Sequence, residues 1–243
     1  MSTLLISDLH LDASRPEVTK LFLEFLGGQA RSAASLYILG DLFEAWLGDD
    51  DPDPHHAEVA AALAELSASG VPVYFLVGNR DFLLGRDYAR RASMELLTEP
   101  VRLDLYGTPT LLLHGDVLCT DDTEYQAFRA MVRDPGWQKA FLERPLAERR
   151  MMAEQARERS RSRGQTLDED IMDVNAEAVV EAFRTHAVPR MIHGHTHRPH
   201  IHHIEVDGKP HERIVLGDWY EQGSVLEINA GGAELNSLPL PGN

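Results

Sequence analysis

The sequence contains a single cysteine, Cys119, among 243 residues, so no intramolecular disulfide can form. A chain without disulfides is typical of a reducing compartment. The sequence also lacks any apolar run near the ~20 residues that a membrane-spanning helix needs, so any membrane contact must be peripheral. At the N-terminus, Asp8 comes too early to leave room for the apolar and cleavage regions of a secretory signal. We therefore expect a cytoplasmic protein.

Positive charge is scarce, with 23 Lys and Arg against 39 Asp and Glu and a net charge of −16. Such a chain repels nucleic acid, which we do not expect as a partner. Residues 126–165 are the exception, because they hold 10 basic and 5 acidic residues. The same segment carries Phe128, Met131, Phe141 and Met152. It therefore indicates a surface for an anionic and partly apolar partner.

Five short apolar runs predict strands buried on both faces: residues 3–7, 35–39, 71–77, 108–114 and 190–193. Helical patterns at 17–28 and 56–68 separate the first three runs. Alternating segments beyond residue 200 predict two hairpins. The order of elements is typical of an α/β protein.

A helical insertion of about residues 121–186 separates the fourth and fifth runs. One helix is predicted up to the Pro135–Gly136 break, a second after Pro145 and a third near 169–186. No internal repeat or interdomain linker is visible. We therefore expect a single domain over residues 1–243, with the insertion as a lid.

Every predicted strand is followed by side chains that can bind a metal: Asp8 and His10, Asp41, Asn79, His114, and His195 with His197. Each signal alone is weak, because Gly-Asp and Gly-Asn usually mark turns and a lone histidine is more often a core residue. Five such coincidences are improbable, and open α/β sheets build their sites at these strand ends. If the chain is extended there, both members of each i, i+2 pair face the same way. The ligand types suit Mn²⁺, Fe²⁺ or Zn²⁺.

This series of motifs resembles the calcineurin-like metallophosphoesterases over residues 8–197. The resemblance implies a four-layer α-β-β-α sandwich with a helical lid and two metal ions per chain, with Mn²⁺ favoured. It assigns the first metal to Asp8, His10, Asp41 and His197. It assigns the second metal to Asp41, Asn79, His114 and His195. It also implies catalytic roles for Asn79, Arg80 and His195.

Two positions depart from the pattern of that family. Glu44 replaces an aspartate, and Arg80 replaces a histidine that protonates the leaving group. An alkoxide leaving group needs a proton donor, whereas a phosphate with a second pKa near ~6 does not. Arginine donates protons poorly but stabilises phosphoryl charge through its planar fork of donors. Arg80 therefore favours cleavage of a pyrophosphate, the alternative being an ordinary surface arginine in a turn.

Within the family, residues 78–82, 171–175 and 192–199 and the basic insertion resemble the pyrophosphohydrolases of lipid A biosynthesis. The resemblance implies water attack on the α-phosphorus of UDP-2,3-diacylglucosamine, giving UMP and 2,3-diacylglucosamine 1-phosphate (lipid X). The substrate-binding residues that it implies are Asn79, Arg80, Asp122, Tyr125, Arg157, Ser160 and His195. Gly164 and Leu167 depart from the polar residues common at those positions. The acylated substrate implies peripheral contact with the anionic cytoplasmic face of the inner membrane, without an obligate protein partner.

Several alternatives stay open at this point. The substrate could be a soluble nucleotide pyrophosphate or phosphodiester, or the chain could be a scaffold without catalysis. The apolar residues of the insertion could line an acyl channel or pack among themselves. His193 could support the ligands from behind or simply end a strand, while His200, His202 and His203 suit a surface hairpin better than a third metal.

Overall fold

The computed structural model describes residues 1–164 and 173–240. Within them, one sheet has six strands in the order β11-β10-β1-β2-β3-β4. Their bounds are Gly232–Pro239, Gln222–Asn229, Thr3–Ile6, Ser35–Leu39, Val73–Leu76 and Met94–Leu96. The strands from β1 to β4 run parallel, so their carboxyl ends meet at one edge of the sheet.

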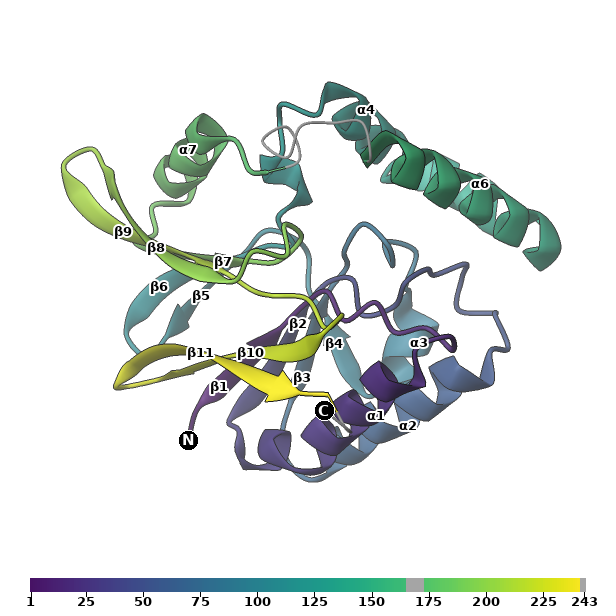
Figure 1. The fold of residues 1–243 in the computed structure, drawn as a ribbon, viewed down its shortest axis with the longest axis horizontal. Coiled ribbons are helices and arrows are strands. Elements are labelled where there is room, and N and C mark those ends of the chain that lie inside the picture. Colours follow the sequence, from purple (N-terminus) through teal and green to yellow (C-terminus); the bar gives the residue numbers. More distant parts are fainter. Residues whose placement is uncertain (165–172, 241–243) are drawn as a thin grey trace.

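Three helices connect these parallel strands: α1 (Pro16–Gly27), α2 (Pro54–Ala68) and α3 (Arg86–Arg91). They cover the outer face of the first sheet (Figure 1). α1 begins at Pro16, whose fixed φ suits a first helical turn, and buries Leu21, Phe22 and Phe25 on one stripe. That stripe packs with residues of β1 and β2 in one apolar core.

The second sheet has the order β5-β6-β7-β9-β8. Its strands are Val101–Leu105, Thr108–Leu112, Arg190–His193, Lys209–Val215 and His200–Val206. Leu112 and Ile192 of this sheet pack against Leu5 and Leu39 of the first. On the outer face, α7 (Ala176–His186) buries Phe183. The layers are therefore α-β-β-α, which confirms the predicted fold class (Figure 1).

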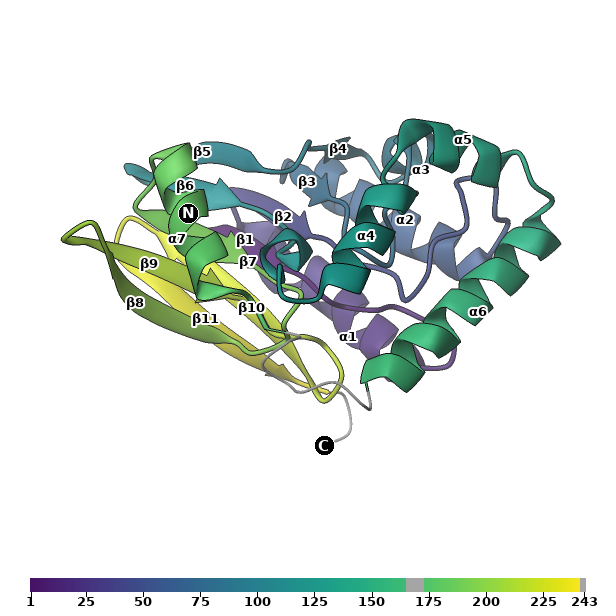
Figure 2. The ribbon, with the colours of Figure 1, turned by 90° about the horizontal axis from the view of Figure 1, so that it is seen from above.

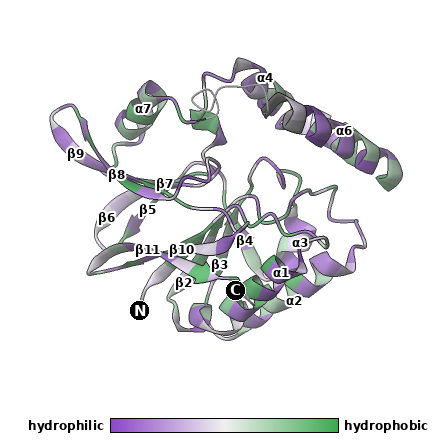
Figure 3. Ribbon diagram, viewed as in Figure 1, coloured by the Kyte–Doolittle hydropathy of each residue, from purple (hydrophilic) through white to green (hydrophobic). Residues whose placement is uncertain are grey.

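Three more helices follow β6: α4 (Thr123–Val132), α5 (Pro135–Leu142) and α6 (Leu146–Gly164). Figure 2 shows them beside the strand ends rather than over a sheet face. Hydrophilic residues run along most of α6 (Figure 3). No helix among the described residues is long and apolar enough to cross a membrane.

The five predicted strands are confirmed as β1, β2, β3, β6 and β7, and the two hairpins as β8–β9 and β10–β11. The short elements α3, β4 and β5 were not predicted, and neither was α5, which begins at Pro135 where a break between helices was expected. The helix expected near 169–186 begins later, because the Asn175 side chain accepts hydrogen bonds from the backbone N–H groups of Glu177 and Ala178 and so caps α7. The first part of that expected range, 169–172, lies outside the described residues.

Candidate metal centre

The seven predicted ligands follow the carboxyl ends of five strands. Asp8 and His10 follow β1, Asp41 follows β2, Asn79 follows β3, His114 follows β6, and His195 and His197 follow β7. The two sheets place these strand ends side by side, so residues up to 189 positions apart in the sequence come together. We call this group of seven side chains the cradle.

Asp8, His10 and His197 form one half of the cradle. The Nε2 atoms of His10 and His197 lie 3.3 Å apart. Asp8 Oδ1 lies 3.4 Å from Nε2 of His197 and 4.0 Å from Nε2 of His10. One potential ligand atom from each of the three residues lies within 4.8 Å of the other two, close enough to share a cation.

Asn79, His114 and His195 form the other half. Asn79 Oδ1 lies 2.8 Å from Nε2 of His114 and 2.8 Å from Nδ1 of His195. His114 Nδ1 lies 2.8 Å from the carbonyl oxygen of Leu39, which leaves Nε2 facing the cradle. The ring is therefore oriented by the backbone of β2.

Asp41 lies between the two halves. Its Oδ2 is 3.8 Å from Nε2 of His10, and its Oδ1 is 3.7 Å from Nε2 of His114. One carboxylate thus reaches both histidine groups, which is the position a bridging ligand needs. The family resemblance assigns that role to the same residue.

The donor set fits divalent cations. Asp8 Oδ1 is fully buried and has no hydrogen-bond partner, an arrangement that is costly unless a cation satisfies the oxygen. Burial alone would raise the pKa of Asp8, but the His197 ring, 3.4 Å away, and the nearby His114 lower it below its usual range. The carboxylate is therefore ionised, and imidazole with carboxylate oxygen suits Mn²⁺, Fe²⁺ and Zn²⁺.

The backbone at the cradle is strained. Five of the seven ligands have left-handed φ values, namely Asp8 (55°), His10 (49°), Asp41 (52°), His195 (69°) and His197 (56°). Each such residue costs about 1–2 kcal/mol, and this kind of strain gathers at functional sites. The expectation of extended i, i+2 pairs is wrong, since β1 ends at Ile6 and β7 at His193, before either pair begins.

Two glycines let the backbone approach the cradle. A Cβ on Gly78 would lie 2.1 Å from Asp41 Oδ1, and one on Gly194 would lie 2.2 Å from Asp8 Oδ2. Asp81, which is fully buried, accepts hydrogen bonds from the backbone N–H groups of Gly78 and Leu42, both at 2.7 Å. It thereby ties the loops after β2 and β3 together. Burial, and then the charge of Asp41, raises the pKa of Asp81 to about 6.

Glu44 and Arg80, the two residues that depart from the family pattern, contact each other. Glu44 Oε1 lies 3.8 Å from Nη1 of Arg80, while its Oε2 lies 3.2 Å from Nδ1 of His10. The Arg80 backbone N–H donates to Asp41 Oδ1 at 2.8 Å, so the arginine is anchored beside the cradle. Its Nε is buried without a hydrogen-bond partner. A donor of this kind fits an anionic ligand.

A polar network joins α4 to the cradle. Asp116 Oδ2 accepts hydrogen bonds from the Tyr125 hydroxyl at 2.7 Å and from Arg129 Nε at 2.8 Å. Arg129 Nη2 also donates to Glu99 at 3.2 Å, and Glu99 accepts from the His114 backbone N–H at 2.6 Å. Burial and the neighbouring Asp116 raise the pKa of Tyr125, so its hydroxyl stays protonated.

The predicted substrate residues stand in different positions. Tyr125 faces His195, with 6.0 Å between ring centroids. Asp122 caps α4 by accepting the Tyr125 backbone N–H at 2.9 Å. Arg157 lies half-buried on α6, whereas the side chain of Ser160 lies outside the described residues. Gly164 is the last residue of α6, and Leu167 lies outside the described residues.

The apolar residues of the insertion divide into two groups. Phe141 is buried and, with Met152, packs against the core of the first sheet. Phe128 and Met131 on α4 are 40% and 48% exposed. The first two residues therefore attach the insertion to the domain, and the second two are free to meet a ligand.

The remaining histidines lie outside the cradle. His193 is fully buried behind it, with Nδ1 facing the Gly194 carbonyl at 2.8 Å and Nε2 within 3.2 Å of Arg213 Nη1. Burial lowers the pKa of His193 to about 3, so the ring is neutral. His200, His202 and His203 lie on β8, and none belongs to a group of three potential ligands among the described residues.

Asp218 and Tyr220 were missed in the sequence. Asp218 Oδ2 lies 3.3 Å from Nδ1 of His197, and the Tyr220 ring stacks on His10 at 5.3 Å. Burial opposes protonation of His197, but Asp218 and Asp8 together raise its pKa to about 10. Gly217–Asp218 comes one residue after the end of β9, much as Gly40–Asp41 directly follows β2, and this Gly-Asp signal could have identified the segment.

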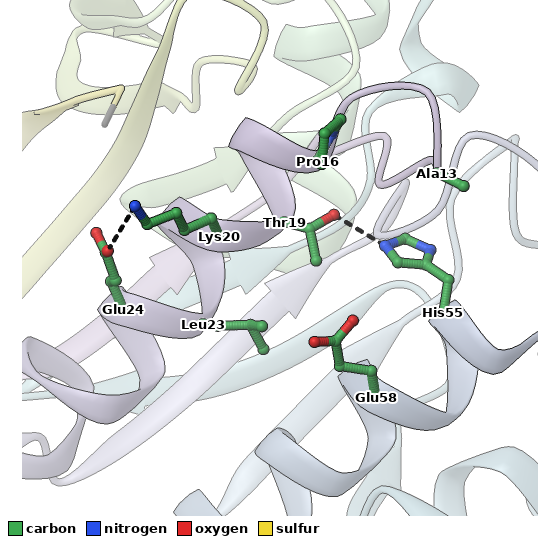
Figure 4. Close-up of a pocket in the computed structure, with 8 residues that line it drawn as sticks. All are labelled: Ala13, Pro16, Thr19, Lys20, Leu23, Glu24, His55 and Glu58. Atoms are coloured by element: carbon green, nitrogen blue, oxygen red, sulfur yellow. Dashed lines mark hydrogen bonds and ion pairs between the residues drawn. The ribbon is translucent and has the colours of Figure 1, made fainter. Parts of the chain in front are cut away.

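A depression of about 600 Å³ lies elsewhere, between α1 and α2 (Figure 4). A hydrogen bond of 2.8 Å between Thr19 and His55 joins its two walls. None of the seven cradle residues lines it, and Lys20 pairs with Glu24 at 3.9 Å on its rim. This depression is therefore separate from the candidate metal centre.

Comparison with known proteins agrees with the geometry. The calcineurin-like phosphoesterase family matches residues 1–199. A UDP-2,3-diacylglucosamine hydrolase of Stenotrophomonas maltophilia (strain K279a) is 58% identical, over 98% of this chain and 99% of its own. One of Xanthomonas axonopodis pv. citri (strain 306) is 54% identical, over 99% and 100%. The chain belongs to the calcineurin-like phosphoesterase family.

Proposed function

We propose that this chain hydrolyses the pyrophosphate bond of UDP-2,3-diacylglucosamine to give UMP and lipid X, a step of lipid A biosynthesis. The relatives named for that substrate match it nearly from end to end. The observation that carries the proposal is the position of Arg80 beside the bridging Asp41, where a phosphate leaving group needs charge stabilisation rather than a proton.

Two divalent cations, with Mn²⁺ favoured, complete the site in this proposal. Asp8, His10 and His197 would hold one, Asn79, His114 and His195 the other, and Asp41 both. Such a pair, when bound, supplies a nucleophilic hydroxide and clamps the developing charge on the phosphoryl group.

Arg80 and Glu44 act on the substrate phosphates in this proposal. The 3.8 Å contact between them holds the guanidinium loosely, so that it can turn its fork of donors towards a phosphoryl oxygen. The unsatisfied Nε gains a partner when the anion binds. Asn79 and His195 complete the catalytic group beside it.

The insertion of residues 121–186, in a single domain of 1–243, would act as the lid over the substrate. Asp122, Tyr125, Arg157 and Ser160 would contact the nucleotide and sugar. The exposed Phe128 and Met131 would contact acyl chains. The local excess of basic residues at 126–165 supports peripheral contact with the anionic cytoplasmic face of the inner membrane.

The test is hydrolysis of UDP-2,3-diacylglucosamine by the purified chain with Mn²⁺ in ¹⁸O-water. Water attack on the α-phosphorus places the new oxygen on that atom, while the bridging oxygen leaves with the β-phosphate. The label should therefore appear in UMP and not in lipid X. Label in lipid X would overturn the proposed attack, and equal turnover of an unacylated UDP-sugar would favour a soluble nucleotide pyrophosphate as substrate.

A further inference from the structure

Residues 216–221 cross from the second sheet to the first and pass over the cradle. The strand before them, β9, ends at Val215, and the strand after them, β10, begins at Gln222. The crossing is fixed by its ends, because the Gly217 backbone N–H donates to the buried Ser224 hydroxyl at 3.1 Å. This hydrogen bond ties the start of the crossing to β10.

Trp219 anchors the centre of this crossing. Its side chain is fully buried in the core of the first sheet. It meets Phe22 and Phe25 of α1 edge-on, at 6.0 Å and 5.8 Å between ring centroids. A large aromatic residue packed in this way leaves its two neighbours little freedom to move.

These neighbours contact one half of the cradle. Asp218 reaches His197, and the Tyr220 ring lies nearly parallel to His10, with an angle of 11° between the planes. The Trp219 backbone N–H donates to the carbonyl oxygen of Asp8 at 3.2 Å. Three consecutive residues therefore touch the three ligands of the first half.

The contact between Asp218 and His197 has a chemical consequence. A carboxylate at Nδ1 favours the tautomer that carries hydrogen on Nδ1, and the lone pair of Nε2 is then free for a metal. In this structure, Nε2 of His197 faces Asp8 Oδ1 and His10. The ring is thus held in the orientation that a metal ligand needs.

Tyr220 restrains His10 by stacking its ring on the imidazole. Arg15 lies over the Tyr220 ring at 4.6 Å, and its guanidinium also donates to the carbonyl oxygen of His10. His10, Tyr220 and Arg15 thus brace one another at the rim of the cradle. The hydroxyl of Tyr220 takes no part in this stack.

We infer that Asp218 and Tyr220 are positioning residues that orient His197 and His10 for the first metal ion. They lie outside the part of the chain that matches the family, residues 1–199. The second half of the cradle is built differently, since His114 is oriented by the Leu39 carbonyl. The inference rests on the proposed pair of cations.

The experiment measures metal binding directly. The purified full chain is stripped with a chelator and titrated with Mn²⁺, and bound and free metal are quantified by electron paramagnetic resonance. The wild type should bind two equivalents. Asp218→Ala should weaken one of them about 10–100-fold and leave the other unchanged, as loss of a partner behind a metal-bound histidine does. Asp218→Asn should lose less, because its amide oxygen still accepts a hydrogen bond.

Tyr220 supplies a second pair of variants. Tyr220→Phe should bind Mn²⁺ like the wild type, whereas Tyr220→Ala should weaken the same single equivalent. Asp207→Asn is the matched control, because Asp207 is an exposed carboxylate whose partner, Arg184, lies on α7. That variant should leave both equivalents unchanged.

The outcomes separate the inference from the proposed function. A wild type that binds fewer than two equivalents contradicts the proposed cation pair. If Asp218→Ala still binds two equivalents with unchanged affinity, the inference is wrong, but the proposed cation pair is not contradicted. Loss of both equivalents together with a lower melting temperature also overturns it, because the residue would then support the fold rather than one ligand.

Discussion

The cradle and the helical insertion differ in burial, backbone strain and polarity. In the cradle, Asp8, Asp41 and His114 are buried, and most of the ligands sit on strained backbone. In the insertion, α6 is largely hydrophilic (Figure 3), and α4 exposes Phe128 and Met131. The first region is fixed from all sides, and the second is attached at a few points.

Each helix of the insertion is attached to the domain through one or two side chains. α4 is held through Asp116 and Arg129, α5 through Phe141, and α6 through Arg149, whose side chain is only 2% exposed. A metal site needs its ligands within fractions of an ångström, whereas a surface for flexible acyl chains needs apolar area more than exact geometry. The contrast fits the proposed function, in which the cradle carries the chemistry and the insertion selects the substrate.

Asp41→Ala tests the cradle at its centre and should have the largest effect. The carboxylate that reaches both halves is lost, so kcat/KM for UMP release should fall about 10³-fold or more. Bound metal, measured by elemental analysis, should fall in parallel. Asp87→Ala, which removes an exposed carboxylate paired with Arg90, is the control. An Asp41→Ala enzyme of full rate would refute the site.

Arg80→Ala tests whether Arg80 stabilises charge on the substrate phosphate or helps to hold the metal ions. We expect kcat to fall about 10²-fold, as removal of a group that stabilises transition-state charge does, with bound metal unchanged. Arg80→Lys should recover little of the rate, because an ammonium lacks the planar fork. If Arg80→Ala instead loses metal, the arginine belongs to the structure of the cradle.

Replacing Phe128 and Met131 together by serine tests the insertion. Burying one such side chain against an acyl chain is worth about 1.5–3 kcal/mol, so kcat/KM for the acylated substrate should fall about tenfold or more. Hydrolysis of a small chromogenic diester, which has no acyl chain, should not change. Tyr106→Ser removes an aromatic side chain that is 39% exposed on the far turn between β5 and β6 and should affect neither substrate. An equal fall in kcat/KM for both substrates would mean that these residues support the structure of the cradle rather than contact acyl chains.

The sequence predicted the layered fold because buried strands give unbroken apolar runs that are easily recognised. It also placed the seven candidate ligands at strand ends, and the structure brings them together. The short elements β4, β5 and α3 were not predicted, because a segment of three to six residues shows too little periodicity to be recognised.

Other features depend on tertiary contacts that no local pattern encodes. The left-handed backbone at Asp8 and His10 arises from loops tied together across two strands, so it could not be predicted from spacing. Asp218 reaches the cradle only because Trp219 is anchored in the core on the far side. Whether Phe141 or Phe128 is buried likewise depends on where the insertion docks, and helical periodicity alone does not fix that.

The smallest effect is expected at the attachment of α6, where two variants separate a buried hydrogen bond from a surface ion pair. Arg149 donates to the Leu47 carbonyl at 2.6 Å and to Asp50 at 2.8 Å, and the Asp50 side chain is 64% exposed. Asp50→Ala should therefore cost about 0–1 kcal/mol of unfolding free energy in urea and leave kcat/KM nearly unchanged. Arg149→Ala should cost more, because the Leu47 carbonyl also loses its donor. Equal losses in the two variants would show that the ion pair, rather than the backbone contact, holds the insertion to the domain.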